Sequence, residues 1–239
     1  PVHHPFEQRT EAPGGNFAEN KYYHHGGTLK EALANWYRGN GVGEEWLTAD
    51  HIILGNGSYD ILCNLNLLCL TRGKKVLGHA PQFTAYVDHV NCTGSVYECC
   101  YLDRSDGYRF HVDDYLAKMS AEYGLFIVEN PINPTGLPVS LEDIARIARR
   151  AEEWGKLLVV DEAYAEYLPF SASAINLIPS HPNLIVTRSF SKGWGMAGVR
   201  LGYGVSSTQC GLLPQLEKLV LPFNSNGIAR GLAPTALGT

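Results

Sequence analysis

Apolar residues alternate along the chain between short continuous runs and longer stretches of helical period. The runs predict β-strands, and they lie at residues 52–55, 76–78, 95–102, 125–128, 157–160 and 184–187. The stretches with apolar residues three and four positions apart predict helices, and they lie at residues 28–38, 59–70 and 140–154. Continuous apolar strands separated by helices indicate an α/β fold with a mainly parallel sheet, covered by helices on both faces.

Polar residues follow four of these predicted strands. In an open α/β sheet the ligand site lies beyond the carboxyl ends of the strands, so the residues that leave each strand are candidates for chemistry. These exits are Gly55–Ser58, Asn130–Gly136, Asp161–Tyr164 and Ser189–Lys192. The sequence therefore predicts that segments far apart in the chain converge at one edge of the sheet.

Two of the exits have both a structural and a functional interpretation. Gly57 and Ser58 form a Gly-rich turn before a helix, whose backbone N–H groups would attract a phosphate, although no Gly-Lys-Ser/Thr follows as in a Walker loop. The same residues could be only a turn. Asn133 lies in a turn with two X-Pro steps and could offer its amide to a ligand oxygen, or form an Asx turn ahead of the helix at Ser140.

The other two exits carry charged side chains. Asp161 ends an apolar strand, where a carboxylate needs a partner, and that partner could be a cationic ring nitrogen, a salt bridge or a helix N-terminus. Lys192 is flanked by hydroxyls and glycines, and Arg200 follows eight residues later. A lone lysine is normally solvated, but Lys192 lies beside apolar and aromatic residues, where its side chain could be buried.

A second pattern overlaps the last exit and points to a different ligand. Gly193, Gly195 and Gly198 fit the G-x-G-x-x-G pattern of dinucleotide-binding folds. The context does not fit, because residues 199–205 look extended where that fold needs a helix. About 20 residues further on, Glu217-Lys218-Leu219 lies in a stretch that looks helical, where that fold needs an acid at the end of a strand. We therefore set the dinucleotide interpretation aside.

Composition and charge exclude several other classes. The chain has 239 residues, of which 45% are hydrophobic and 18% charged, as in globular proteins. Its net charge of -5 and lack of a basic run leave no electrostatic footprint for nucleic acid. No apolar run is long enough to span a membrane, and the N-terminus does not resemble a signal peptide. The six cysteines form no C-x-x-C pair, which indicates reduced thiols in a cytoplasmic protein, and no His or Cys set has zinc spacing, so we expect no metal site.

Seven segments in order resemble the fold-type I pyridoxal-phosphate enzymes, and specifically the class I and II aminotransferases. They run from about Asn20 to about Ala236 and read NKYYHH, LGNGSYDIL, APQFTAY, ENPINPTG, VVDEAYAEY, SFSKGWGMAGVRLGY and PFNSNGIA. Each segment is short, but the order and spacing of all seven are hard to reconcile with chance. The histidinol-phosphate aminotransferase-like branch of the family is the most similar.

The resemblance implies a role for each matching residue. Lys192 would form a Schiff base with pyridoxal 5′-phosphate, Asp161 would hydrogen-bond the pyridine nitrogen, and Phe83 would stack on the ring. Tyr164 and Asn133 would donate to the phenolic oxygen. Lys192, Asp161 and Tyr164 are thereby implied in catalysis. The residues implied to hold the phosphate are Gly57, Ser58, Ser189, Ser191 and Arg200.

The resemblance also implies a division of the chain and a homodimer. Residues 1–27 would form an N-terminal arm, residues 28–222 the cofactor-binding large domain, and residues 223–239 the start of a connection to a small domain. Tyr22 would reach the phosphate held by the neighbouring subunit. The family's small C-terminal domain, which supplies the arginine for the substrate carboxylate, is expected to be missing from this chain.

The function that the resemblance implies is an aminotransferase, which moves an amino group between an amino acid or a phosphorylated amine and a 2-oxo acid. One alternative is a lyase or decarboxylase of the threonine-phosphate decarboxylase type, which differs in the α-carbon bond that lies perpendicular to the ring. Another is a degenerate, non-catalytic paralogue. The intact set of Lys192, Asp161 and Arg200 argues against the last alternative, and the missing small domain argues for it.

Overall fold

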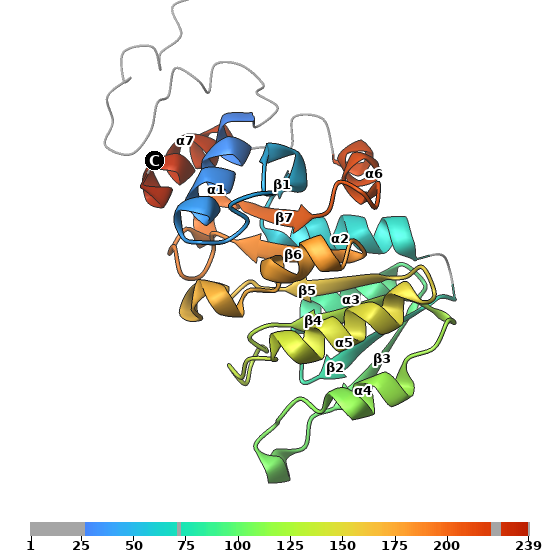
Figure 1. Ribbon diagram of the computed structural model, residues 1–239. Helices are drawn as coiled ribbons and strands as arrows, with labels where there is room; N and C mark the ends of the chain where they lie inside the picture. Colours follow the sequence, from blue (N-terminus) through green and yellow to red (C-terminus); the bar gives the residue numbers. More distant parts are fainter. Residues whose placement is uncertain (1–26, 71–72, 221–225, 239) are drawn as a thin grey trace, which may run out of the picture.

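The computed structural model describes residues 27–70, 73–220 and 226–238, which form one seven-stranded sheet between two layers of helices (Figure 1). The strands are β1 (Ile52–Gly55), β2 (Lys75–Ala80), β3 (Val96–Tyr101), β4 (Tyr123–Glu129), β5 (Leu157–Asp161), β6 (Leu184–Ser189) and β7 (Gly202–Ser206). Their order is β1-β7-β6-β5-β4-β2-β3, and each neighbouring pair is parallel except the two that involve β7. The expected α/β fold with a mainly parallel sheet is confirmed.

Helices cover both faces of this sheet. The α-helices of the described ranges are α1 (Gly27–Gly39), α2 (Ser58–Cys69), α3 (Thr84–Cys92), α4 (Val112–Lys118), α5 (Leu141–Glu152), α6 (Leu212–Leu219) and α7 (Gly227–Leu237). Helices α1, α4, α5 and α7 contribute to the core on one face, and α2, α3 and α6 to the core on the other. Figure 1 shows α5 lying across β4 and β5, with α2 and α3 behind the sheet.

The central strand β4 shows why the strands of this sheet are continuous apolar runs in the sequence. Phe126 and Val128 belong to the core on the α5 side, whereas Leu125 and Ile127 belong to the core on the α2 side, and all four are fully buried. Successive side chains of a strand point to opposite faces, so a strand covered on both faces must be apolar at every position. The runs in the sequence therefore mark the buried strands.

The antiparallel direction of β7 brings Arg200, which precedes this strand, to the edge of the sheet where the parallel strands end. Strands β1, β4, β5 and β6 end there, whereas the antiparallel β7 begins there, so Arg200 lies beside their exits. Gly202 pairs with Gly55 on one side and Ser189 on the other. A Cβ at Gly202 would lie 2.3 Å from the backbone of the Gly57–Ser58 turn, so only glycine allows the strands to approach this closely.

Some expectations concern residues that the structure does not describe. Others concern described residues, but the structure does not test them. Tyr22 and the predicted arm lie outside the described residues. Helix α7 packs against α1 and buries Ala229, Ala233 and Leu237 in the larger core. The division into an arm, a large domain and a connection stays a prediction.

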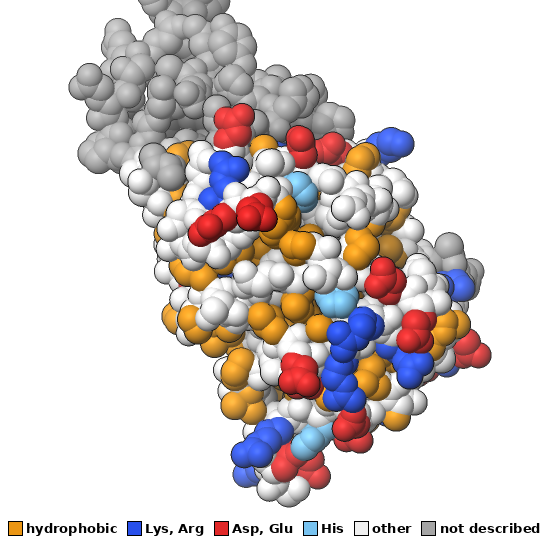
Figure 2. Space-filling model, in the orientation of Figure 1, with side chains coloured by type: hydrophobic (Ala, Val, Ile, Leu, Met, Phe, Trp, Pro, Cys, Tyr) orange, Lys and Arg blue, Asp and Glu red, His pale blue; other side chains and the backbone are white. Residues whose placement is uncertain are grey.

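The surface of the described residues shows no segregation of charge on the face drawn in Figure 2. Acidic and basic side chains are interspersed on the face shown in Figure 2, and neither sign forms a continuous field there. No helix within the described ranges is long and apolar enough to cross a membrane. Within the same ranges, no three His, Cys, Asp or Glu side chains are grouped so as to hold a metal ion.

Candidate functional site

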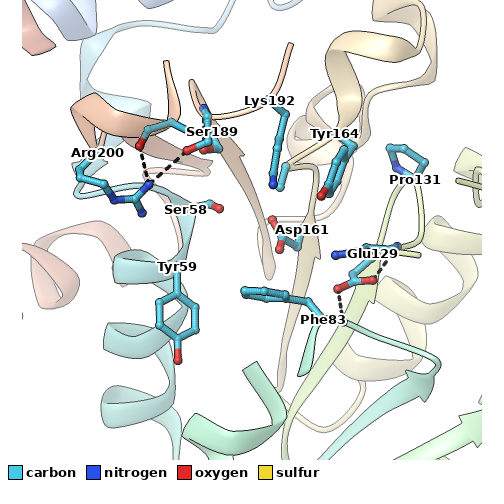
Figure 3. A pocket seen from close by; sticks show the side chains of 14 residues that line it. Ser58, Tyr59, Phe83, Glu129, Pro131, Asp161, Tyr164, Ser189, Lys192 and Arg200 are labelled. Carbon is cyan, nitrogen blue, oxygen red and sulfur yellow. Dashed lines mark hydrogen bonds between the residues drawn. The ribbon is translucent and has the colours of Figure 1, made fainter. Parts of the chain in front are cut away.

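A cavity of about 220 Å³ opens at the edge of the sheet where the parallel strands end. The residues predicted from the sequence that line it are Ser58, Phe83, Asn133, Asp161, Tyr164, Ser189, Ser191, Lys192 and Arg200 (Figure 3). The rest of the lining consists of residues that received no individual role from the sequence: Tyr59, Glu129, Pro131, Ala163 and Ala197. The convergence of distant chain segments is therefore found in the structure.

Arg200 forms one side of the cavity, where hydroxyl and backbone groups gather. Its Nη1 donates to the carbonyl of Ala197 at 3.0 Å and to Ser191 Oγ at 3.4 Å, and its Nη2 donates to the carbonyl of Asn56 at 3.3 Å. The residue has a left-handed backbone conformation with φ of 52°, which is uncommon outside glycine and often found at functional sites. A guanidinium has five N–H donors, so Arg200 can hold an anion in addition to these contacts.

The start of helix α2 lies against the same guanidinium. Gly57 precedes the helix with φ of 85°, and a Cβ at this position would lie 2.6 Å from Arg200 Nη2. Ser58, the first residue of the helix, lines the cavity, as does Ser189, whose Oγ accepts the N–H of Ser191 at 3.0 Å. A helix N-terminus, a guanidinium and several hydroxyls in one place make a suitable site for a phosphate group.

Asp161 lies at the end of β5, with its carboxyl group in the cavity (Figure 3). The Oγ1 of Thr187 donates to Asp161 Oδ1 at 2.8 Å. Burial, with a smaller contribution from the charge of Glu162, raises the pKa of Asp161 to about 6. Among the described residues, the nearby salt bridges to Arg188 use Glu162 and Glu166 and not Asp161. A cation in the cavity would provide the partner that a buried carboxylate needs.

Lys192 lies beside apolar residues in the sequence, which are compatible with a buried side chain. Its side chain is exposed and not buried, and Figure 3 shows it pointing into the cavity beside Tyr164. The Nζ lies 5.0 Å from the centre of the Tyr164 ring. Phe190, which is fully buried, takes the apolar position in the core and packs on Trp194, so the chain after it turns outward to the mouth of the cavity. A primary amine at this position is accessible to a small ligand.

Phe83 and Asn133 reach the cavity from the loops that follow β2 and β4. The Phe83 side chain is 37% exposed and packs edge-on against Tyr59, with ring centres 5.8 Å apart. An exposed aromatic face in a cavity can stack on a planar ligand. Glu129 was not among the predicted site residues, but its carboxylate accepts the backbone N–H groups of Phe83 and Asn133, each at 2.9 Å. Glu129 ends a buried strand, which is the same signal that singled out Asp161.

These groups together define the kind of ligand that the cavity suits. Arg200 and the α2 N-terminus favour a phosphate, Asp161 favours a basic ring nitrogen, and Phe83 favours a planar ring. The amine of Lys192 can react with a carbonyl group. The residues present therefore fit an aromatic phosphate ester that carries a carbonyl group. The Gly193, Gly195 and Gly198 pattern instead lies in a loop before an antiparallel strand, which agrees with setting the dinucleotide interpretation aside.

Comparison with known proteins identifies the family. The model of the family described as aminotransferase class I and II matches residues 6–239. This chain belongs to the class I and II aminotransferases. The histidinol-phosphate aminotransferase 1 of Mesorhizobium japonicum is 32% identical over 215 residues, which cover 89% of this chain and 55% of that protein. The histidinol-phosphate aminotransferase 2 of Nitrosospira multiformis is 34% identical over 212 residues, which cover 87% of this chain and 50% of that protein.

Solved structures agree with this assignment to the class I and II aminotransferases. One of them is the histidinol-phosphate aminotransferase from Sinorhizobium meliloti, solved in complex with pyridoxal-5′-phosphate. The match covers 89% of this chain and 55% of the chain of that enzyme, with a TM-score of 0.77 and 28% sequence identity. A mutant of Thermus thermophilus aspartate aminotransferase has the same fold, with a TM-score of 0.74 and 24% identity. The chain spans about half the length of the curated relatives it matches. The predicted family and fold class are confirmed, and the role of each site residue stays a prediction.

Proposed function

We propose that the cavity binds pyridoxal 5′-phosphate and that the whole protein is an aminotransferase. It would move an amino group between an amino acid or a phosphorylated amine and a 2-oxo acid. The observation that carries the proposal is the convergence of Lys192, Asp161 and Arg200 on one cavity. An amine, a buried carboxyl group and a guanidinium are the groups needed to hold an aromatic phosphate ester through its carbonyl, its ring nitrogen and its phosphate.

The side chains of the cavity that the family resemblance singled out each have a task in this proposal. When bound, pyridoxal 5′-phosphate supplies an aldehyde that condenses with amines and a ring that takes up electrons from the substrate α-carbon. Asp161 accepts a hydrogen bond from the ring nitrogen and favours its protonated form. Tyr164 and Asn133 donate hydrogen bonds to the phenolic oxygen, and Phe83 stacks on the ring. Lys192 would supply the amine that faces the aldehyde and the base that moves a proton at the substrate α-carbon.

The phosphate end is held without a metal in this proposal. The groups that would bind the phosphate are the backbone at Gly57, the hydroxyls of Ser58, Ser189 and Ser191, and the guanidinium of Arg200. Hydrogen bonds from a cation and from a helix N-terminus to a phosphate are charge-assisted, which makes them stronger than bonds between neutral groups. These contacts would anchor the cofactor at one end and leave its reactive end facing Lys192.

The relatives suggest which substrate to try first. Several curated relatives are named histidinol-phosphate aminotransferase, so a phosphorylated amine of that kind is the leading candidate. The arginine that would bind a substrate carboxylate has no counterpart among the residues that line the cavity, where Arg200 is assigned to the cofactor phosphate.

We also propose that the protein is a homodimer, in which residues 1–27 form an arm and Tyr22 serves the neighbouring site. We further propose a cytoplasmic location, which the six free cysteines support.

The cofactor can be tested by absorbance. The protein incubated with pyridoxal 5′-phosphate should show a band near the edge of the visible range, and Lys192→Ala should lose it. Lys218→Ala, which removes an exposed lysine from α6, is the matched control and should keep the band. A wild-type protein without the band would contradict the proposal.

The reaction type needs a second measurement on the loaded protein. Keto product formed from an amino donor beyond one equivalent per cofactor only when a 2-oxo acid is present would support transamination. Release of carbon dioxide would instead support the decarboxylase alternative. A loaded protein that turns over neither kind of substrate would support the non-catalytic alternative.

A further inference from the structure

Glu129 is a buried glutamate that none of the roles above uses. It is the last residue of β4, its side chain is almost completely buried, and it lines the cavity. Its Oε1 accepts the N–H of Phe83 and its Oε2 accepts the N–H of Asn133, each at 2.9 Å (Figure 3). One carboxyl group therefore joins the loop after β2 to the loop after β4. These are the two loops that carry the proposed ring-stacking residue and a proposed donor to the phenolic oxygen.

His79 extends this connection on the other side of the Phe83 loop. Its Nε2 accepts the backbone N–H of Glu129 at 3.1 Å, and its Nδ1 donates to the carbonyl of Pro81 at 2.9 Å. The imidazole is neutral in this arrangement, because burial lowers the pKa of His79 to about 4. The loop that carries Phe83 is thus held at Pro81 by His79 and at Phe83 by Glu129.

We propose that Glu129 is a positioning residue, which holds Phe83 and Asn133 at the distance from each other that a bound cofactor ring requires. His79 supports it by fixing the backbone of Glu129 against the Phe83 loop. The inference rests on the proposed function, since it takes Phe83 and Asn133 as cofactor contacts. A glutamate is suited to the task because a carboxylate has two oxygens that can each accept one N–H group.

The strength of the hydrogen bonds from Phe83 and Asn133 to Glu129 depends on whether the Glu129 carboxyl group is ionised, and its surroundings determine this. The titratable groups that face it are Asp161 from β5, His79 from β2 and Tyr97 from β3. His79 is neutral, and burial raises the pKa of Tyr97 well above 10, so Asp161 is the charged neighbour among them. Burial and the charge of Asp161 raise the pKa of Glu129 to about 8. A cation in the cavity would favour the ionised form, whose hydrogen bonds to N–H groups are stronger.

Amide hydrogen exchange of the cofactor-free protein tests the contact directly. Glu129→Gln keeps the size of the side chain but turns an amino group toward one of the two N–H donors. At a pH above 8, where Glu129 is ionised, we expect the amide that faces this amino group, at Phe83 or Asn133, to exchange about tenfold faster in Glu129→Gln, since a hydrogen bond to a charged group is worth about 1.5 kcal/mol or more. Glu98→Gln, on the exposed strand β3, is the control and should leave both amides unchanged. Equal exchange in wild type and Glu129→Gln would overturn the inference.

The wild-type protein provides a test that needs no folded variant. Exchange at Phe83 and Asn133, corrected for its intrinsic dependence on pH, should slow as the pH rises through about 8, where Glu129 ionises. Protection that does not depend on pH in this range would count against Glu129 as the acceptor.

Cofactor binding separates this inference from the proposed function. If wild type binds pyridoxal 5′-phosphate, Glu129→Gln should raise its Kd about tenfold and shift the absorbance of the bound form, because one of the two loops is released. Identical affinity and absorbance in the variant would overturn the positioning role and leave the proposed function intact. If wild type binds no pyridoxal 5′-phosphate, the proposed function fails and the positioning role fails with it. Slow amide exchange at Phe83 and Asn133 in the wild type would then show only that the two hydrogen bonds to Glu129 exist.

Two substitutions of His79 examine the supporting contact. His79→Gln places a carbonyl oxygen where Nε2 accepts the N–H of Glu129, whereas His79→Asn retains only a donor near the carbonyl of Pro81. Cofactor affinity should be retained better in His79→Gln than in His79→Asn. The reverse order would contradict the support of Glu129 by His79.

Discussion

Asp161 and Glu129 are paired neighbours on the parallel strands β5 and β4, and both carboxyl groups line the same cavity. Burial is the main reason that the pKa of Asp161 rises to about 6 and that of Glu129 to about 8. The pKa of Asp161 is the lower of the two, so Asp161 is the first of the pair to ionise, which suits a ligand with a cationic group near it.

The hydroxyl of Thr187 should set the pH at which the cavity loses its cofactor in acid. Thr187 donates to Asp161 at 2.8 Å, and this hydrogen bond lowers the pKa of Asp161 against the larger effect of burial. Thr187→Val removes the bond, so the pKa of Asp161 should rise by about one unit, and cofactor affinity should fall off at a correspondingly higher pH. Affinity measured against pH checks this, with Thr187→Ser as the control that keeps the hydroxyl. An unchanged acid limb in Thr187→Val would mean that Asp161 does not pair with the cofactor.

The Gly57 position should be sensitive to a single added carbon. A Cβ would lie 2.6 Å from Arg200 Nη2, so Gly57→Ala should displace the guanidinium and raise the Kd for pyridoxal 5′-phosphate about tenfold or more. Gly155 also has positive φ but has nothing within 4 Å of an added Cβ. Gly155→Ala therefore also places a side chain at a positive φ, but without the steric contact. If both variants bind the cofactor equally well, the phosphate is not held at Gly57 and Arg200.

The pH dependence of stability should report on Glu129. Its folded pKa of about 8 lies above the ordinary value of 4.5, so the folded protein holds a proton that the unfolded chain has released. The stabilisation is complete below pH 4.5 and is lost as the pH rises through 8. From about pH 6.5 to about pH 8.5, the free energy of unfolding of the cofactor-free protein should fall by roughly 2 kcal/mol through this group.

Urea unfolding at several pH values measures that loss. Glu129→Gln should flatten the decline, because the amide does not titrate. His79 acts in the opposite direction, since its lowered pKa removes stability as the pH falls below 6.5, and it therefore does not contribute in the chosen interval. A decline of the same slope in wild type and Glu129→Gln would assign it to other groups.

The sequence was sufficient for the strands and for most of the cavity, and the reasons are physical. Strands covered on both faces must be continuously apolar, so runs such as Leu125–Val128 mark them, and the residue after each run lies at the ligand edge. The direction of β7 is not encoded in such a run, because parallel and antiparallel strands can have the same pattern. The approach of Arg200 to the Gly57–Ser58 turn depends on that direction and became visible only in three dimensions.

Two side chains show where local pattern was misleading or insufficient. The apolar neighbours of Lys192 in the sequence are compatible with a buried side chain, but Phe190 takes the place in the core and the lysine faces the cavity mouth. Glu129 ends its strand as Asp161 does, yet its function as a connection between two loops depends on backbone N–H groups that no sequence pattern displays. Side-chain exposure and contacts to the backbone are decided by the packing of several elements.

The buried cluster on the other side of the β5 and β6 exits should be the main electrostatic support of the site. Arg188 donates to Glu162 at 2.8 Å and to Glu166 at 3.0 Å, and the side chains of Arg188 and Glu162 are almost fully buried. Glu162 follows Asp161 directly, and Arg188 precedes Ser189, so the ion pair connects the two chain segments that supply the cavity. Removing one partner of a buried pair leaves an uncompensated charge, so Arg188→Met should lower the free energy of unfolding by about 3–5 kcal/mol.

The exposed pair of Arg150 with Glu153, at 3.0 Å on α5, is the matched comparison for that substitution. Arg150→Met should cost less than about 1 kcal/mol, because solvent screens an exposed pair and the freed carboxylate is hydrated. Chemical unfolding of both variants gives the two values, and cofactor affinity should fall only in Arg188→Met, where the segments that carry Asp161 and Ser189 are no longer held together. Similar losses of stability in the two variants would show that Glu162 and Glu166 find other compensation, and the cluster would then not be what fixes the two strand ends.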